Sequence, residues 1–138
     1  MSVEMVALRF RDVPEGSFHF GAFDGITLIG TATFMREPGL KERHKGHIYG
    51  VYVTPARRRA GVGRALIGTI VERVKQDPSL EQTLLAVATG EDAAKQLYRD
   101  FGFRTYGIEP SALKVGSVYI DEEQMILRVS RADRSLPC

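Results

Sequence analysis

The chain has 138 residues, of which 43% are hydrophobic, and its 19 basic and 17 acidic residues give a formal net charge of +2. This length fits one folded domain, and so balanced a charge argues against a nucleic-acid-binding domain, which is usually strongly basic. The only cysteine is Cys138, so no disulfide can form within the chain, as is usual in the cytoplasm. The sequence contains no recognisable signal peptide and no membrane span of roughly 20 apolar residues. We therefore expect a cytoplasmic protein without a membrane segment.

The first half of the chain predicts a hairpin and a third strand. Alternating residues in 18–23 lead to Asp24-Gly25, a pair that is typical of a tight β-hairpin, and 26–35 is the expected returning strand. Residues 36–46 are charged and predict an exposed loop. The next segment, 47–54, is rich in β-branched and aromatic residues and predicts a strand.

Within that third strand, Gly50 predicts a bulge or a close backbone approach. From Gly61 the apolar residues recur at helical spacing, and the pattern stops before Asp77-Pro78. The expected apolar face of this helix consists of Val62, Ala65, Leu66, Ile70 and Val74. The remaining predicted elements are a buried strand at 83–88, a helix at 91–101, and strands at 103–108 and 118–129.

The second helix has recognisable ends. Thr89 and Asp92 predict an N-terminal cap, and Gly102 stands where a helix C-terminal glycine belongs. The order of elements predicts an α/β (α+β) domain with helices packed on a mixed sheet. We assign this domain to residues 1–130 and a tail to 131–138.

A basic turn precedes the first helix. Arg57, Arg58, Arg59 and Arg64 crowd its N-terminal end, although the helix dipole favours acidic residues there. A bound anion would turn this repulsion into attraction, and the neighbouring glycines would let backbone N–H groups approach a phosphate. The alternative is a solvated basic turn. The combination of strand, basic turn, glycines and helix favours an anion site.

Two motifs carry a family resemblance. Arg58-x-x-Gly61-x-Gly63 resembles the (Gln/Arg)-x-x-Gly-x-(Gly/Ala) motif of the GNAT superfamily of N-acetyltransferases, and it fits neither a dinucleotide fingerprint nor a P-loop. Residues 94–103, AKQLYRDFGF, resemble the second motif of the same family. The resemblance covers 18–129. It implies a GNAT-like mixed, mostly antiparallel sheet with a strand–turn–helix acyl-CoA site, acetyl-CoA as cosubstrate, and no metal.

The resemblance also implies where acetyl-CoA binds. In such enzymes the pantetheine arm lies in a gap beside the strand that precedes the basic turn, and the pyrophosphate is held by main-chain N–H groups of the turn. Glu91 stands where many members carry asparagine, and Ala60 replaces a common basic residue. The implied cofactor-binding residues are Val51, Tyr52, Val53, Arg58, Arg59, Ala60, Gly61, Val62, Gly63, Arg64, Glu91 and Tyr98.

The implied activity is transfer of an acetyl group from acetyl-CoA to a primary amine by direct attack in a ternary complex. This reaction needs a base, an oxyanion donor and an acid. Tyr98 matches the family tyrosine near the CoA sulfur, and the Val53 N–H is the implied oxyanion donor. His47 lies eleven residues before Arg58, where the family often places a glutamate base, and an imidazole can serve there. Core packing for Tyr98 and a sheet-end role for His47 remain alternatives.

Little of the chain precedes residue 18, whereas the family usually has a strand and one or two helices there. Those helices normally form a wall of the acceptor site, so we expect an open site or a wall supplied by a second chain. An uncovered edge of the 18–35 hairpin would favour a homodimer. The alternative is a monomer whose N-terminal segment folds back as an edge strand. Residues 36–46 and 109–117 are the expected acceptor contacts.

The partners expected are therefore acetyl-CoA and an amine acceptor, with neither nucleic acid nor membrane. A non-catalytic acyl-CoA-binding or regulatory module of the same fold is the alternative function. It would keep the basic turn but release no CoA when an amine is added.

Overall fold

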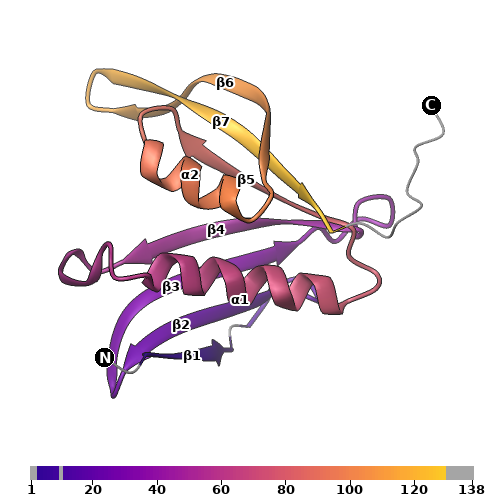
Figure 1. Cartoon of the computed structure of the whole chain (residues 1–138). Helices are drawn as coiled ribbons and strands as arrows, with labels where there is room; N and C mark the ends of the chain where they lie inside the picture. The colour runs from indigo at the N-terminus through magenta and orange to yellow at the C-terminus, as the bar shows by residue number, and fades with distance from the viewer. Residues whose placement is uncertain (1–2, 10, 130–138) are drawn as a thin grey trace.

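The computed structural model describes residues 3–9 and 11–129, so the expected tail at 131–138 and Cys138 lie outside the described residues. The elements are β1 (Val3–Leu8), β2 (Phe18–Asp24), β3 (Thr27–Arg36), β4 (Lys45–Val53), a 3₁₀ turn (Pro55–Arg57), α1 (Val62–Gln76), β5 (Gln82–Ala88), α2 (Asp92–Asp100), β6 (Arg104–Val115) and β7 (Val118–Arg128). The strands form one seven-stranded sheet in the order β1-β2-β3-β4-β5-β7-β6 (Figure 1). Only β4 and β5 are parallel neighbours, so the mixed, mostly antiparallel sheet is confirmed.

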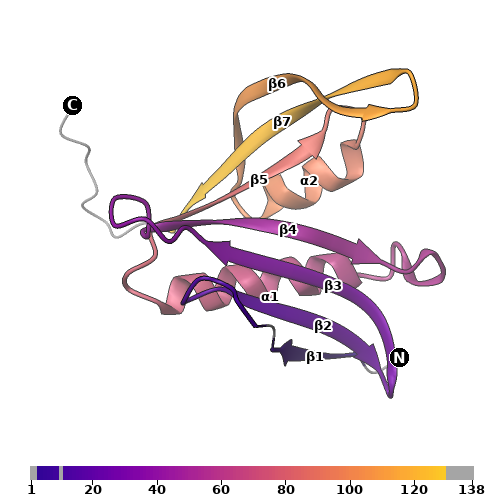
Figure 2. The same cartoon turned by 180° about the vertical axis from the view of Figure 1, so that it is seen from behind.

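The sheet opens into two halves. β4 and β5 pair only where Lys45–His47 meets Gln82–Leu84, and beyond these residues the two strands separate (Figure 1). Both helices cover the same face of the sheet, α1 over β2–β4 and α2 over β5–β7. Figure 2 shows the opposite face, where no helix of the described chain lies in front of the strands. The site is built around this opening.

Strand alternation builds the core beneath α1. Phe18 lies opposite Phe34, and Phe34 lies opposite Ile48, so these buried side chains share the face that α1 covers. Ala65 is exposed, although it was expected on the apolar face of α1. The buried face of the helix instead includes Ile67 and Val71, which the predicted spacing did not contain. The buried residues of α1 are Val62, Leu66, Ile67, Ile70, Val71 and Val74.

The second helix is tied to the sheet by a lysine rather than by the expected cap. α2 begins after Glu91, and no side chain caps it, so the expected Thr89–Asp92 cap is wrong. Lys95 Nζ instead donates to the Thr89 carbonyl at 2.8 Å and to Glu123 on β7 at 2.7 Å. The hydrogen bond to Glu123 raises the pKa of Lys95, and the same bond lowers the pKa of Glu123. Both groups therefore stay charged through the neutral range.

The N-terminal segment forms the outer strand of the sheet. β1 pairs along β2 from Val3 opposite Asp24 to Leu8 opposite His19. The expected uncovered edge of the 18–35 hairpin is therefore wrong, because the outer edge of β2 is paired. The argument from that edge to a homodimer is lost, and the dimer itself stays a prediction.

The two segments expected to contact the acceptor, 36–46 and 109–117, are partly strand. β3 runs to Arg36 and β4 starts at Lys45, where the Glu37 N–H bonds to the Lys45 carbonyl at 3.0 Å. Most of 109–117 is strand, because the hairpin of β6 and β7 continues to Val115 opposite Val118. Charged residues occupy both segments, since a sheet that faces solvent accepts them.

We expect Gly46→Ala to destabilise the fold by about 1–3 kcal/mol, the usual cost of overpacking. Gly46 lies where β4 meets β5, and a Cβ there would collide with the Phe34 ring and lie 2.7 Å from the Met35 carbonyl oxygen. Gly107→Ala is the matched strand control, because a Cβ at that position meets nothing within 4 Å. Chemical denaturation measures both variants. Equal stability of the two would contradict the proposed close packing at Gly46.

Candidate active site

The site begins with a bulge in β4. The register steps from Thr33 opposite Tyr49 to Thr31 opposite Tyr52, so β4 carries one extra residue there. Gly50 adopts φ +60° within this bulge, a conformation that suits glycine, and its carbonyl accepts a hydrogen bond from the Thr31 hydroxyl at 3.2 Å. The bulge predicted at Gly50 is confirmed. It bends β4 at the level where β4 and β5 have already separated.

At the end of β4, some main-chain groups point into the gap between β4 and β5. The Thr54 N–H bonds to the Ile29 carbonyl of β3 at 2.9 Å. Because an antiparallel ladder alternates its hydrogen bonds, the Tyr52 main chain is directed to β3 and the Val53 main chain to the gap. The Val53 carbonyl indeed accepts a bond from Arg58 Nε at 3.0 Å. The Val53 N–H is thus available to a ligand between β4 and β5.

The turn before α1 leaves a helix N-terminus free. Gly61 is the N-cap with φ +84°, and the first turn contains no acidic residue. The Ala65 N–H bonds to the Gly61 carbonyl at 3.0 Å, so the N–H groups of Val62, Gly63 and Arg64 have no carbonyl within the helix. Such groups, together with the helix dipole, bind phosphate and other anions.

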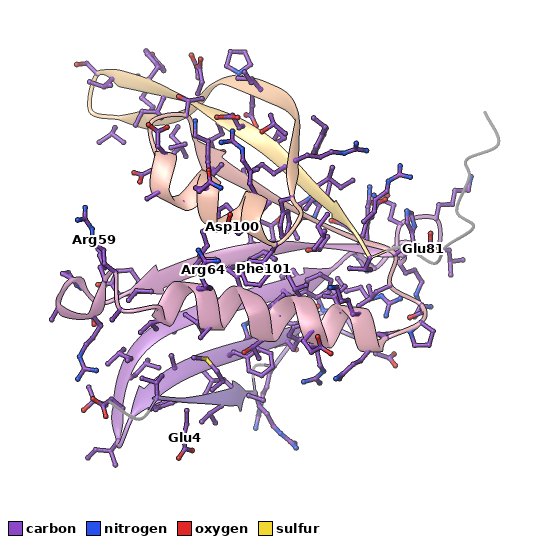
Figure 3. The ribbon with its side chains drawn as sticks, viewed as in Figure 1. Glu4, Arg59, Arg64, Glu81, Asp100 and Phe101 are labelled. Carbon is purple, nitrogen blue, oxygen red and sulfur yellow. The ribbon has the colours of Figure 1, made fainter. Side chains whose placement is uncertain are left out.

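The arginines of this turn point in different directions. Arg57 pairs with Asp24 of the β2–β3 hairpin at 2.6 Å, and Arg64 pairs with Asp100 of α2 at 2.9 Å. Arg58 lies over the Tyr52 ring, 5.8 Å from its centroid. Figure 3 shows Arg59 standing off the turn on the side of the α2 half of the molecule. The four side chains therefore do not form one cluster.

A cavity of about 620 Å³ lies between this helix N-terminus and α2. Of the twelve expected cofactor residues, Val53, Arg58, Arg59, Gly61, Gly63, Arg64 and Glu91 line it. Val62 is instead buried in the core, where its side chain is 3% exposed, so only its main chain can serve a ligand. Tyr52 and Ala60 do not line this cavity, whereas Val51 and Tyr98 line a second one.

The second cavity, of about 560 Å³, follows the first along β4, since Val51 lines one and Val53 the other. His47 and Tyr49 of β4 lie on one side, and the α2 residue Tyr98 also lines it. Tyr98 is 8% exposed, and burial raises the pKa of its hydroxyl. Among residues 3–9 and 11–129, no group forms a hydrogen bond with this hydroxyl. It therefore keeps its proton at neutral pH and can donate it to a ligand.

His47 has a carboxylate beside it. Its Nδ1 lies 3.4 Å from Glu37 Oε1, and its ring stacks on Tyr49 with 5.7 Å between the ring centroids. The imidazole is 30% exposed at the side-chain level. The expected base thus lines the same cavity as the expected acid.

Part of this cavity is lined by residues that were not predicted from the sequence. Glu122 and Gln124 of β7 line it together with Glu109 of β6. Only Glu109 fell in a segment that was expected to contact the acceptor. The alternation along 118–129 placed Glu122 and Gln124 on one face of their strand, and that signal could have found them. The alternation could not show which residues of other strands lie opposite that face.

The chain can now be compared with known proteins. The family model described as the GNAT acetyltransferase family matches residues 2–103. The chain belongs to the GNAT family of acetyltransferases. The predicted family is therefore confirmed, whereas no curated protein sequence matches the chain.

Solved structures of GNAT acetyltransferases have the same fold. An acetyltransferase of the GNAT family from Streptococcus pneumoniae aligns with TM-score 0.78 and 21% identity over 83% of this chain and 67% of that chain. A probable acetyltransferase from Staphylococcus epidermidis aligns with TM-score 0.74 and 27% identity over 83% and 68% of the two chains. A putative acetyltransferase from Salmonella typhimurium, solved with its cofactor acetyl-CoA, aligns with TM-score 0.77 and 18% identity over 89% and 70%.

Neither a metal site nor a membrane-spanning helix is found in the described residues. Within 3–9 and 11–129, no three or more His, Cys, Asp or Glu side chains are grouped so as to hold a metal ion. In the same ranges, no helix has the length and apolar character needed to cross a membrane.

We expect Gly63→Glu to weaken CoA binding by about tenfold or more, because a carboxylate would face the phosphates at the helix N-terminus. Gly63 lines the cavity, and a Cβ there meets only Val53 Cγ2, at 3.8 Å. Gly63→Gln is the matched control of equal size without charge. Gly61 is a poorer position for this test, because its φ of +84° strains any side chain. Calorimetry measures the affinities, and equal affinity of the Glu and Gln variants would contradict an anion site here.

Proposed function

We propose that this protein is an N-acetyltransferase that transfers an acetyl group from acetyl-CoA to a primary amine by direct attack in a ternary complex. One observation carries the proposal. The cavity at the free N-terminus of α1 is followed along β4 by the cavity that Tyr98 lines, and within the described residues the Tyr98 hydroxyl has no hydrogen-bond partner. An anionic cofactor and a proton donor would therefore lie in neighbouring cavities along one strand.

Acetyl-CoA would bind along this gap. The pyrophosphate would accept hydrogen bonds from the main-chain N–H groups at the start of α1, beside Arg58 and Arg59. The pantetheine amides would then bond to main-chain groups of β4 that face the gap. This arrangement satisfies β4 groups that β5 leaves unpaired.

The reaction would proceed where the two cavities adjoin along β4. The amine nitrogen attacks the thioester carbonyl, a C–N bond forms, and the C–S bond breaks as the electrons move to sulfur. The Val53 N–H would stabilise the oxyanion, and Tyr98 would donate its proton to the departing thiolate. The nitrogen loses a proton to His47, directly or through water.

Incubating the protein with acetyl-CoA and a panel of amines tests the proposal. The panel should contain polyamines, amino acids, aminoglycosides and peptides with free N-termini. Free CoA would be followed by thiol detection, and the acetylated amine by mass spectrometry. Binding of CoA without acceptor-dependent release by any amine would favour the non-catalytic acyl-CoA-binding module instead.

We expect Tyr98→Phe to lower kcat by about 10²–10⁴-fold, the usual contribution of a general acid. The KM for acetyl-CoA should change little, because Tyr98 lines the second cavity and not the one at the helix N-terminus. Steady-state kinetics measures both constants. Wild-type turnover in the variant would make Tyr98 a packing residue.

We expect His47→Ala to flatten the acidic limb of the rate–pH profile, because that limb reports protonation of the base. His44→Ala is the control, because His44 lines neither of the two cavities. A His47→Ala profile with the shape of the wild-type profile would exclude His47 as the base.

A further inference from the structure

The second cavity has two acidic side chains on one wall. Glu109 of β6 and Glu122 of β7 are direct cross-strand partners, and both line the cavity. Directly opposed residues have Cβ atoms about 4.5–5.5 Å apart, where like charges repel. Neither carboxylate has a cationic partner among residues 3–9 and 11–129. A cation between them would turn this repulsion into attraction.

The opposite wall is aromatic. Tyr49 is 53% exposed, and its ring stacks on His47, so these two rings face the cavity from β4. Aromatic faces attract ammonium groups, and carboxylates pair with them. Gln124 adds an amide beside the acidic pair. Two walls of different composition thus favour the same kind of ligand.

Tyr98 marks the end of this cavity where the proposed acetyl transfer would occur. The residue is only 8% exposed, and its hydroxyl has no hydrogen-bond partner in the described part of the chain. The acidic pair lies instead on β6 and β7, and Glu109 is exposed. A molecule in the cavity would therefore present one end to Tyr98 and another part to Glu109 and Glu122.

The Tyr98 end of the second cavity would hold a neutral amine, whereas two carboxylates lie at the other end. The amine that attacks must be neutral, so once its proton has left it cannot balance two carboxylates. A second cationic group on the acceptor would do so. Resting on the proposed acetyltransferase function, we propose that the acceptor is a small diamine or polyamine, whose non-reacting ammonium group binds between Glu109 and Glu122. A zwitterionic amino acid would bring its own carboxylate against this pair.

Three acceptors of equal chain length test the proposal: 1,4-diaminobutane, butylamine and 4-aminobutyrate. They share the reacting amine and differ in a second ammonium, a methyl or a carboxylate at the other end. We expect kcat/KM to fall in that order, by about tenfold for each step. Equal values for the diamine and the monoamine, or a higher value for the amino acid, would overturn the proposal.

Glu109→Gln and Glu122→Gln locate the effect. Each should lower kcat/KM for the diamine by roughly 5- to 20-fold, mainly through KM, and leave kcat/KM for butylamine unchanged. Glu4→Gln is the control, since Glu4 is exposed on β1 at the far edge of the sheet (Figure 3). An equal loss with both amines would assign the carboxylates to proton transfer and would overturn the proposal.

Two further measurements distinguish a failure of the diamine proposal from a failure of the proposed acetyltransferase function. Calorimetry of 1,4-diaminobutane and butylamine with the CoA-bound protein tests selectivity without turnover. Selective diamine binding without acetylation would contradict the proposed function and support the cationic site. Acetylation of all three amines at similar rates would support the function and overturn the diamine proposal. If a glutamine variant does not fold, the wild-type KM for the diamine should still rise with ionic strength more steeply than that for butylamine.

Discussion

The short parallel pairing of β4 with β5 is the constraint on which the site depends. The two strands share only the contacts of Lys45–His47 with Gln82–Leu84 before they separate. Main-chain groups beyond this point need partners, because unpaired backbone polar groups are costly when they are buried. Water or a ligand must supply those partners. The separation therefore creates both the opening and the hydrogen-bonding groups that line it.

Two glycines in β4 make this geometry possible. Gly46 lacks a side chain where the strands are closest and where the Phe34 ring packs against the backbone. Gly50 supports the bulge that comes after the strands separate. Gly46 thus allows close packing where the two halves of the sheet meet, and Gly50 allows β4 to bend along the opening. The two cavities can then follow each other along β4, at Val51 and Val53.

The opening is electrostatically polarised. At one end, the free N-terminus of α1 carries partial positive charge beside Arg58 and Arg59. At the other end, Glu109 and Glu122 carry negative charge. An anionic cosubstrate and a cationic acceptor would thus each meet the opposite sign. The net charge of +2 does not reveal this separation of positive and negative charge, because it is a sum over the whole chain.

Local patterns were sufficient for much of the fold and for one half of the site. Alternation and helical periodicity predicted most of the helices and strands, since both depend on neighbouring residues. The motif around Gly61 predicted a turn with free main-chain N–H groups, and we propose that it binds phosphate, because this chemistry lies in the main chain of consecutive residues. The same motif context singled out Tyr98, and Gly50 predicted the bulge.

Only the tertiary structure decided how distant segments meet. It paired Val3–Leu8 with β2, and it removed Arg57 and Arg64 from a common cluster by pairing them with Asp24 and Asp100. It also placed Glu122 across a cavity from His47. Such contacts join residues that no local period relates, and they depend on how the halves of the sheet diverge. The sequence by itself therefore determined the basic, glycine-bearing turn that we propose binds the cofactor, whereas the cavity proposed for the acceptor arose only when the two halves were brought together.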